Sequence, residues 1–255
     1  MQRYVYGIIQ AQAVETFDVA GLGPDDPKPQ STPLGDGLAM ISTPYRGEKI
    51  RPSRRNMLTH TQVLEHVMGL HDVLPMRFGT LLPAADQGEA ILKANQRQFL
   101  DAFDEVSGCR ELSLKIYWRD GIAFDEILDR NEDLRAARDA LAARDPKQSH
   151  YERIDLGKKI EAAMAEKREA EAMRLRTPLA PICRRFIEGP VNDDLMICNF
   201  SMLVDQADEE ALDTAINTLD QMHGKRLRFR YVGPMPPFSF VELKIDPVTP
   251  EASPA

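Results

Sequence analysis

Residues Arg54–Leu82, with the sequence RRNMLTHTQVLEHVMGLHDVLPMRFGTLL, predict one amphipathic helix followed by one buried strand. Ser53 is a candidate N-cap, and Gly69 is expected to end the helix. Pro75 prevents the helix from continuing, so the apolar segment Val73–Leu82 is predicted to be a strand. Helical spacing assigns the inward-facing stripe to Met57, Thr61, Leu64 and Met68.

The composition is that of a soluble globular protein. The 255 residues include 43% hydrophobic and 28% charged side chains, and the formal net charge is −8. This charge argues against nonspecific binding to nucleic acid or to an acidic membrane, because both need a positive face. No segment approaches the roughly 18 apolar residues of a membrane helix. The three cysteines are too scattered for a disulfide framework, so we expect a cytoplasmic protein.

The order of expected elements predicts an α+β fold with two domains. Residues 1–119 are expected to form an N-terminal α+β domain, and residues 120–178 a charged helical hairpin. Residues 179–245 are expected to be ferredoxin-like and can recruit the strand at 111–118, and the Pro-containing tail 246–255 is expected to be disordered. The remaining strands are expected at 3–9, 38–42, 195–204, 227–231 and 238–245. Helices are expected at 87–106, 124–144, 151–176, 179–186 and 208–224, and a loop at 21–37.

The residues that usually carry chemistry do not form a catalytic or metal-binding pattern. His60, His66 and His71 lack the i, i+4 spacing that brings two ligands onto one helix face, so no metal is expected. His60 is expected to be a hydrogen-bonded, partly buried residue on the polar side of its helix. No Walker loop, dinucleotide fingerprint or nucleophile elbow occurs, so we expect neither a cofactor nor an enzyme.

Three sequence blocks carry a family resemblance. The first is Tyr4-Val-Tyr-Gly-Ile-Ile9. The second combines Arg54, Asn56, His60 and Val63-Leu64-Glu65 with Leu74-Pro75-Met76-Arg77-Phe78-Gly79-Thr80, and the third is Gly233-Pro-Met-Pro-Pro-Phe-Ser-Phe-Val241. In this order they resemble the gas vesicle protein GvpF/GvpL family. The third block departs from the family's pattern, because Met235 and Phe238 stand where Trp and Tyr are frequent.

The resemblance implies an accessory or minor structural protein of gas vesicles. Such a protein would bind the hydrophobic shell protein, and also other gas vesicle accessory proteins, and help the shell to nucleate and assemble without aggregating. It would be found in the gas vesicle, associated with the shell, and in the cytoplasm. Phe78, Phe238 and Phe240 are candidate contacts. The full set of candidate partner-binding or family-motif residues is Arg54, Asn56, His60, Glu65, Arg77, Phe78, Gly79, Gly233, Pro234, Pro236, Pro237, Phe238 and Phe240.

Two other functions remain open from the sequence. A small-ligand sensor or enzyme on a ferredoxin-like fold would need a polar pocket around Asn56, His60 and Arg77. An RNA-binding module would use the arginines of the strand near the C-terminus, which are Arg226, Arg228 and Arg230.

Overall fold

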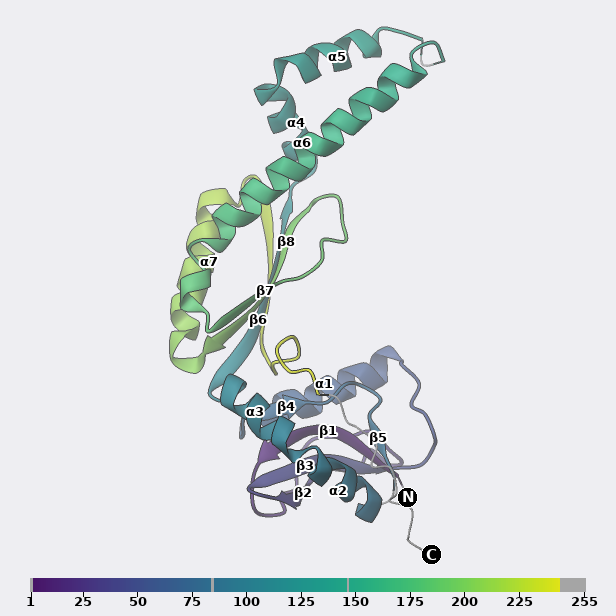
Figure 1. Cartoon of the computed structure of the whole chain (residues 1–255), viewed down its shortest axis with the longest axis vertical. Helices are drawn as coiled ribbons and strands as arrows, with labels where there is room; N and C mark the ends of the chain where they lie inside the picture. The colour runs from purple at the N-terminus through teal and green to yellow at the C-terminus, as the bar shows by residue number, and fades with distance from the viewer. Residues whose placement is uncertain (1, 84, 146, 244–255) are drawn as a thin grey trace, which may run out of the picture. The chain divides into compact units, whose positions relative to one another are not determined.

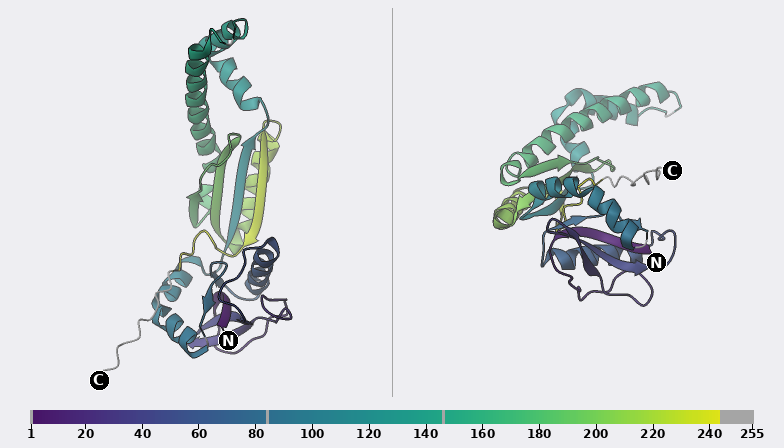
Figure 2. Two further views of the ribbon diagram at one scale, coloured as in Figure 1. Left: turned by 90° about the vertical axis from the view of Figure 1, so that its right-hand side faces the viewer. Right: turned by 60° about the horizontal axis from the view of Figure 1, so that its bottom comes forward.

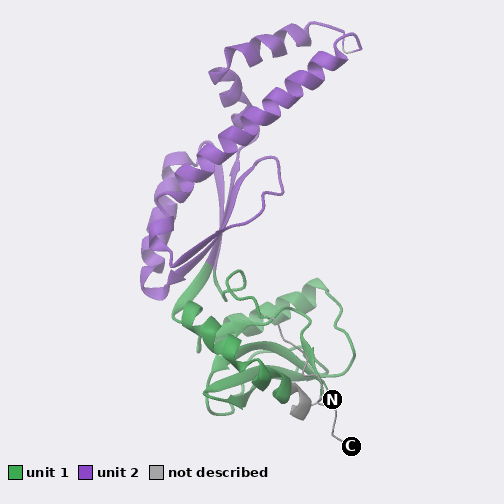
Figure 3. Ribbon diagram, viewed as in Figure 1, with its two compact units in different colours: residues 1–111, 234–255 green, residues 112–233 purple. Residues whose placement is uncertain are grey.

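The computed structural model describes residues 2–83, 85–145 and 147–243, and it divides the chain into two compact units (Figure 3). Unit 1 consists of Met1–Glu111 together with Pro234–Ala255, and unit 2 consists of Leu112–Gly233. These units do not coincide with the expected ranges 1–119, 120–178 and 179–245. The helices after residue 120 share a unit with the strands that follow them, and the chain returns to unit 1 at Pro234. The tail 246–255 lies outside the described residues.

Unit 1 is built on an antiparallel sheet with the strand order β2-β3-β1-β4, and β5 also pairs with β1 (Figure 1). Strand β1 is central, since it pairs with β3, β4 and β5, and its residues Tyr4–Ile9 are buried. Its strands are β1 (Gln2–Gln10), β2 (Gln30–Gly35), β3 (Leu38–Tyr45), β4 (Val73–Pro75) and β5 (Leu81–Leu82). Its helices are α1 (Arg54–Met68), α2 (Ala85–Ala94) and α3 (Gln96–Val106).

Helix α1 begins and ends where the sequence predicts. The Ser53 hydroxyl oxygen accepts the backbone N–H of Asn56 at 3.2 Å, and Gly69 is the C-cap. The predicted buried stripe is partly wrong, because Met57 is 51% exposed. The buried face is rotated toward His60 and consists of His60, Val63, Leu64, Val67 and Met68. A histidine can occupy this core position because both of its ring nitrogens are hydrogen-bonded.

Three other predictions for unit 1 need correction. The strand predicted over 73–82 is two short strands, β4 and β5, which pair with β1 at Gly7↔Pro75 and Tyr4↔Leu81. The helix predicted over 87–106 is two helices that meet at Asn95, whose side-chain amide donates to the Ile91 carbonyl at 2.8 Å. The loop predicted over 21–37 contains strand β2.

Unit 2 combines a four-stranded sheet, ordered β7-β8-β6-β9, with helices (Figure 2). Helix α7 lies along one face of this sheet, and the leucines and aromatic residues between them form the core. The strands are β6 (Cys109–Trp118), β7 (Arg185–Glu188), β8 (Met196–Asp205) and β9 (Leu227–Met235). The helices are α4 (Ile122–Arg130), α5 (Glu132–Ala142), α6 (His150–Arg176) and α7 (Glu209–His223), with short 3-10 helices η1 (Ala180–Ile182) and η2 (Gln206–Asp208). The chain is therefore an α+β protein with two antiparallel sheets.

The structure differs from two predictions made for the second half of the chain. The helix predicted over 179–186 is the short 3-10 helix η1 followed by strand β7. The strand predicted over 238–245 is absent from its described part, residues 238–243, which form a turn and an irregular segment. Strand β9 instead continues to Met235 and ends before Pro236, which has no N–H to donate to a sheet. No described helix combines the length and apolarity that crossing a bilayer requires.

Candidate functional site

His60 of the second sequence block lies in the core of unit 1, with 3% of its surface exposed. Its Nε2 is 3.2 Å from the Met76 carbonyl oxygen, which can only accept a hydrogen bond, so Nε2 carries the proton. Its Nδ1, 2.8 Å from the Tyr4 hydroxyl, therefore accepts the hydrogen bond that this hydroxyl donates. The Tyr4 oxygen in turn accepts the Gly79 N–H at 3.2 Å. These bonds join α1, β1 and the segment 76–80.

Burial of this network keeps the His60 imidazole and the Tyr4 phenol uncharged. Loss of hydration lowers the pKa of His60 to about 4, and burial also raises the pKa of Tyr4. The prediction that His60 is hydrogen-bonded is confirmed, but it lies on the buried face of α1 and not on the polar one. Phe78 packs its ring edge against this network, with its centroid 5.8 Å from that of His60. His60 and Phe78 therefore support the fold more than they offer a surface.

The other polar residues of the second block lie apart from His60. The Asn56 side chain donates to the Arg51 carbonyl at 2.9 Å and lines a separate cavity of about 350 Å³. Arg54 and Glu65 are exposed on α1. The structure therefore does not bring Asn56, His60 and Arg77 together in one polar pocket, which the small-ligand alternative requires.

Residues of the second and third blocks meet in a cavity of about 310 Å³ in unit 1, which we call the motif pocket. One side comes from the end of β4 and the residues after it, and the other comes from the turn that follows β9. Arg77 and Glu242 form an exposed ion pair at 3.6 Å, which contributes little stability because solvent screens it. The lining residues are Pro75, Met76, Arg77, Phe238, Ser239, Val241 and Glu242.

A buried carboxylate holds the third block in place. Glu111 is 2% exposed, and its two oxygens accept the Ser239 backbone N–H at 2.7 Å and the Ser239 hydroxyl at 2.5 Å. Both bonds are strengthened because the acceptor is charged and shielded from water. Sequence reasoning missed this role, because Glu111 stands at the start of a predicted strand and its partner Ser239 is 128 residues further along the chain.

The candidate residues of the third block divide into exposed and buried positions. Gly233 and Pro234 are exposed, and Gly233 has a φ of 137°, which favours glycine. Pro236, Pro237 and Phe240 are buried. Phe238 is 38% exposed at the motif pocket. Among the three candidate aromatic contacts, Phe238 is the most accessible, while Phe78 and Phe240 are mainly packing residues.

The matching family model carries the description "Gas vesicle synthesis protein GvpL/GvpF" and covers residues 2–242. The chain belongs to this family. The GvpL/GvpF chain is 29% identical to gas vesicle protein F of Dolichospermum flosaquae, covering 94% of this chain and 97% of the relative. It is 30% identical to gas vesicle protein F of Microcystis aeruginosa, covering 94% and 98%. Gas vesicle protein L1 of Halobacterium salinarum is 26% identical, covering 93% and 89%.

Solved structures give the same assignment for this GvpL/GvpF protein. The crystal structure of GvpF from Anabaena sp. PCC7120 superposes with a TM-score of 0.82 at 27% identity, covering 95% of this chain and 99% of that one. GvpF from Microcystis aeruginosa gives a TM-score of 0.77 at 28% identity, with the same coverage. The fold is therefore GvpF-like, and the chain is a gas vesicle protein.

The structure also bears on the RNA-binding alternative. The Arg226 guanidinium donates to Glu126 at 2.5 and 2.7 Å and to Glu171 at 2.7 Å, so it is already neutralised by carboxylates. The Arg228 guanidinium lies 4.9 Å from the centroid of the Tyr117 ring. Of the three arginines, Arg226 is thus committed to holding the fold of unit 2.

Proposed function

We propose that this protein is an accessory or minor structural component of gas vesicles that binds the hydrophobic shell protein during nucleation and assembly. The observation that carries the proposal is the family match across residues 2–242, in which the description names gas vesicle synthesis. A shell subunit needs an apolar side that faces gas, and such a side aggregates in water unless another protein covers it. The proposed locations are the cytoplasm and the gas vesicle itself, in association with the shell.

The motif pocket is the proposed contact for the shell protein. Phe238 offers an accessible aromatic ring beside a cavity, which is the type of anchor that protein interfaces favour. Arg77 and Glu242 lie at the same pocket and can donate and accept hydrogen bonds at its rim. Two sets of buried hydrogen bonds hold the residues of this surface in place. The His60 network holds Met76, and the Glu111 carboxylate holds Ser239.

We also assign unit 2 a ferredoxin-like arrangement that carries a charged helical hairpin. Its support is the element order, in which β6 is followed by helices, then by β7, β8, α7 and β9. The strand order β7-β8-β6-β9 places the first and third strands of this series at the centre. The hairpin corresponds to α4, α5 and α6.

Co-purification of the tagged chain with the shell protein tests the proposal, with bovine albumin as the negative control. Phe238→Ser is expected to reduce the recovered shell protein about tenfold. An aromatic side chain that becomes buried on binding contributes roughly 1.4 kcal/mol or more to the binding free energy. Phe124→Ser is a matched control, since Phe124 is 37% exposed but belongs to α4 in unit 2 and does not line the motif pocket. Equal recovery with both variants, or equal retention of albumin, would refute the motif pocket as the contact. Absence of binding by the unchanged chain would refute the function.

A further inference from the structure

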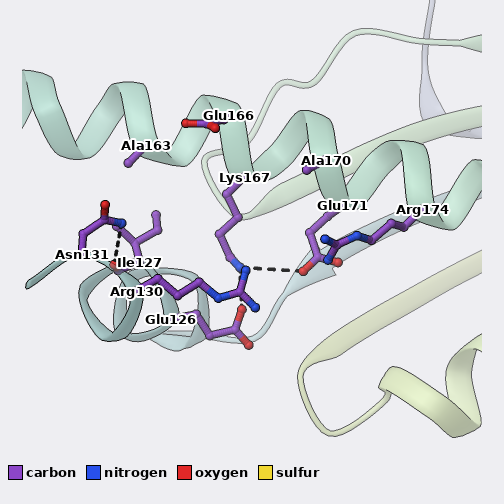
Figure 4. A pocket seen from close by; sticks show the side chains of 10 residues that line it. All are labelled: Glu126, Ile127, Arg130, Asn131, Ala163, Glu166, Lys167, Ala170, Glu171 and Arg174. Atoms are coloured by element: carbon purple, nitrogen blue, oxygen red, sulfur yellow. Dashed lines mark hydrogen bonds and ion pairs between the residues drawn. The ribbon is translucent and has the colours of Figure 1, made fainter.

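Unit 2 contains a cavity of about 280 Å³ between α4 and α6. Figure 4 shows the side chains of Arg130 and Lys167 extending into the space between these helices. The volume is just below the range of about 300 to 1,000 Å³ for small-molecule pockets, so the cavity suits one or two side chains better than a large cofactor. Its lining residues are Glu126, Ile127, Arg130, Asn131, Ala163, Glu166, Lys167, Ala170, Glu171 and Arg174.

One side of this cavity is an ion-pair network in which the charges of two carboxylates and two cations balance. Glu126 accepts from Arg226 and, at 2.6 Å, from Lys167. Glu171 accepts from Arg226 at 2.7 Å and lies 3.7 Å from Lys167. Two carboxylates thus meet two cations, and the Lys167 and Glu171 side chains are less than a tenth exposed. The hydrogen bond from Arg226 lowers the pKa of Glu126 to about 2, so this carboxylate stays ionised at neutral pH.

Two further cations line the cavity without a partner. Within residues 2–83, 85–145 and 147–243, neither Arg130 nor Arg174 forms a hydrogen bond or an ion pair. The remaining acidic lining residue, Glu166, is exposed on α6. With Arg226 included, four cations face three carboxylates. This small excess of positive charge lies in a chain whose net charge is −8, so the cavity is a local exception.

We propose that this cavity binds a carboxylate side chain from an acidic segment of a partner protein. Arg130 and Arg174 would donate to its two oxygens, because the planar guanidinium matches a carboxylate in geometry and charge. Ile127, Ala163 and Ala170 supply apolar walls for the methylene groups of the incoming side chain. Charge complementarity identifies the occupant as acidic. This surface belongs to unit 2, and its role does not depend on the motif pocket.

Fluorescence anisotropy with a labelled peptide of alternating Ala and Glu tests the proposal, and a peptide with Gln in place of Glu is the probe control. The full chain is expected to bind the Glu peptide saturably and to ignore the Gln peptide. The double variant Arg130→Gln, Arg174→Gln is expected to bind at least tenfold more weakly. Arg138→Gln with Lys158→Gln removes the same charge outside the cavity and is expected to bind as the unchanged chain does. Thermal unfolding checks that both double variants fold.

Three results would overturn the proposal. The first is no saturable binding of the Glu peptide by the unchanged chain. The second is equal weakening in both double variants, which would mean that the peptide responds only to overall charge. The third is competition by free glutarate with the same affinity as the peptide, which would identify a small-molecule carboxylate site in place of a docking site.

Discussion

At the scale of single residues, a buried hydrogen-bond chain accounts for four residues of the first two sequence blocks, Tyr4, His60, Met76 and Gly79. Gly79 donates to Tyr4, Tyr4 donates to His60, and His60 donates to the Met76 carbonyl. Each group has a partner, which is the condition for burying polar atoms without a large loss of stability. The neutral imidazole is required, because a protonated Nδ1 could no longer accept the hydrogen bond that the Tyr4 hydroxyl donates.

These hydrogen bonds make the free energy of unfolding decrease as the pH falls. The pKa of His60 is about 4 in the folded protein and about 6.5 when unfolded, so the unfolded state binds more protons between these values. The contribution of neutral His60 to the free energy of unfolding is complete above pH 6.5 and is lost as the pH falls toward 4. We expect the free energy of unfolding to drop by about 2 kcal/mol between pH 7.5 and 4.5 through this group.

Urea unfolding at both pH values measures the drop, and His60→Gln serves as the reference because glutamine does not titrate. The difference between the two proteins isolates the histidine from carboxylates that titrate in the same range. If both proteins lose the same free energy between these pH values, the neutral buried histidine is not the cause.

At the scale of elements, the sequence predicted α1 with its caps, and also most strands, because these depend on local patterns. Ser53 and Gly69 act within one turn of their own helix. The errors occur where a distant partner decides the structure. Residues 185–188 form β7 because β8 offers a pairing edge, and the helical reading of that segment could not include this edge. Likewise, β4 and β5 are separate because each pairs with a different part of β1.

Two glycine substitutions test how elements are joined. Gly79 has a φ of 93°, and an added Cβ would meet only Ile50 Cγ2 at 3.6 Å, so Gly79→Ala introduces strain without a clash. We expect a loss of about 1 to 2 kcal/mol. Gly157 lies inside α6 with nothing within 4 Å, so Gly157→Ala is expected to stabilise by up to about 1 kcal/mol. Thermal unfolding of both variants measures this contrast, and shifts of the same sign would contradict it.

At the scale of the whole molecule, the sequence identified the family, and the quoted blocks contain every residue that lines the motif pocket except Glu242. The sequence did not predict that the second and third blocks meet in a cavity. It did not separate supporting residues from surface ones, because a motif gives identity and spacing but not burial. His60, Pro236, Pro237 and Phe240 are buried, whereas Arg77 and Phe238 are accessible. The cavity between α4 and α6 was also missed. Arg226, which pairs with the cavity residue Glu126, comes from just before β9 and is far from both helices in the sequence.

The charge of the chain and the commitment of Arg226 predict weak binding to RNA. At about 150 mM salt we expect a dissociation constant no tighter than about 100 µM for a labelled single-stranded RNA, because few free cations can replace its counterions. Fluorescence anisotropy at two salt concentrations measures this. Tight binding that weakens steeply with salt, and that is lost in Arg228→Gln, would instead support the RNA-binding function.

The division of the chain into units has a consequence for how the protein is made. Unit 1 includes residues that precede unit 2 in the sequence and residues that follow it, so unit 2 is inserted between them. On the ribosome, Glu111 is synthesised well before Ser239. Its carboxylate therefore cannot accept from the Ser239 backbone N–H and hydroxyl until that residue has been made. We therefore expect unit 2 to be able to fold during translation, while unit 1 gains the Glu111–Ser239 bonds only after Ser239 has been synthesised.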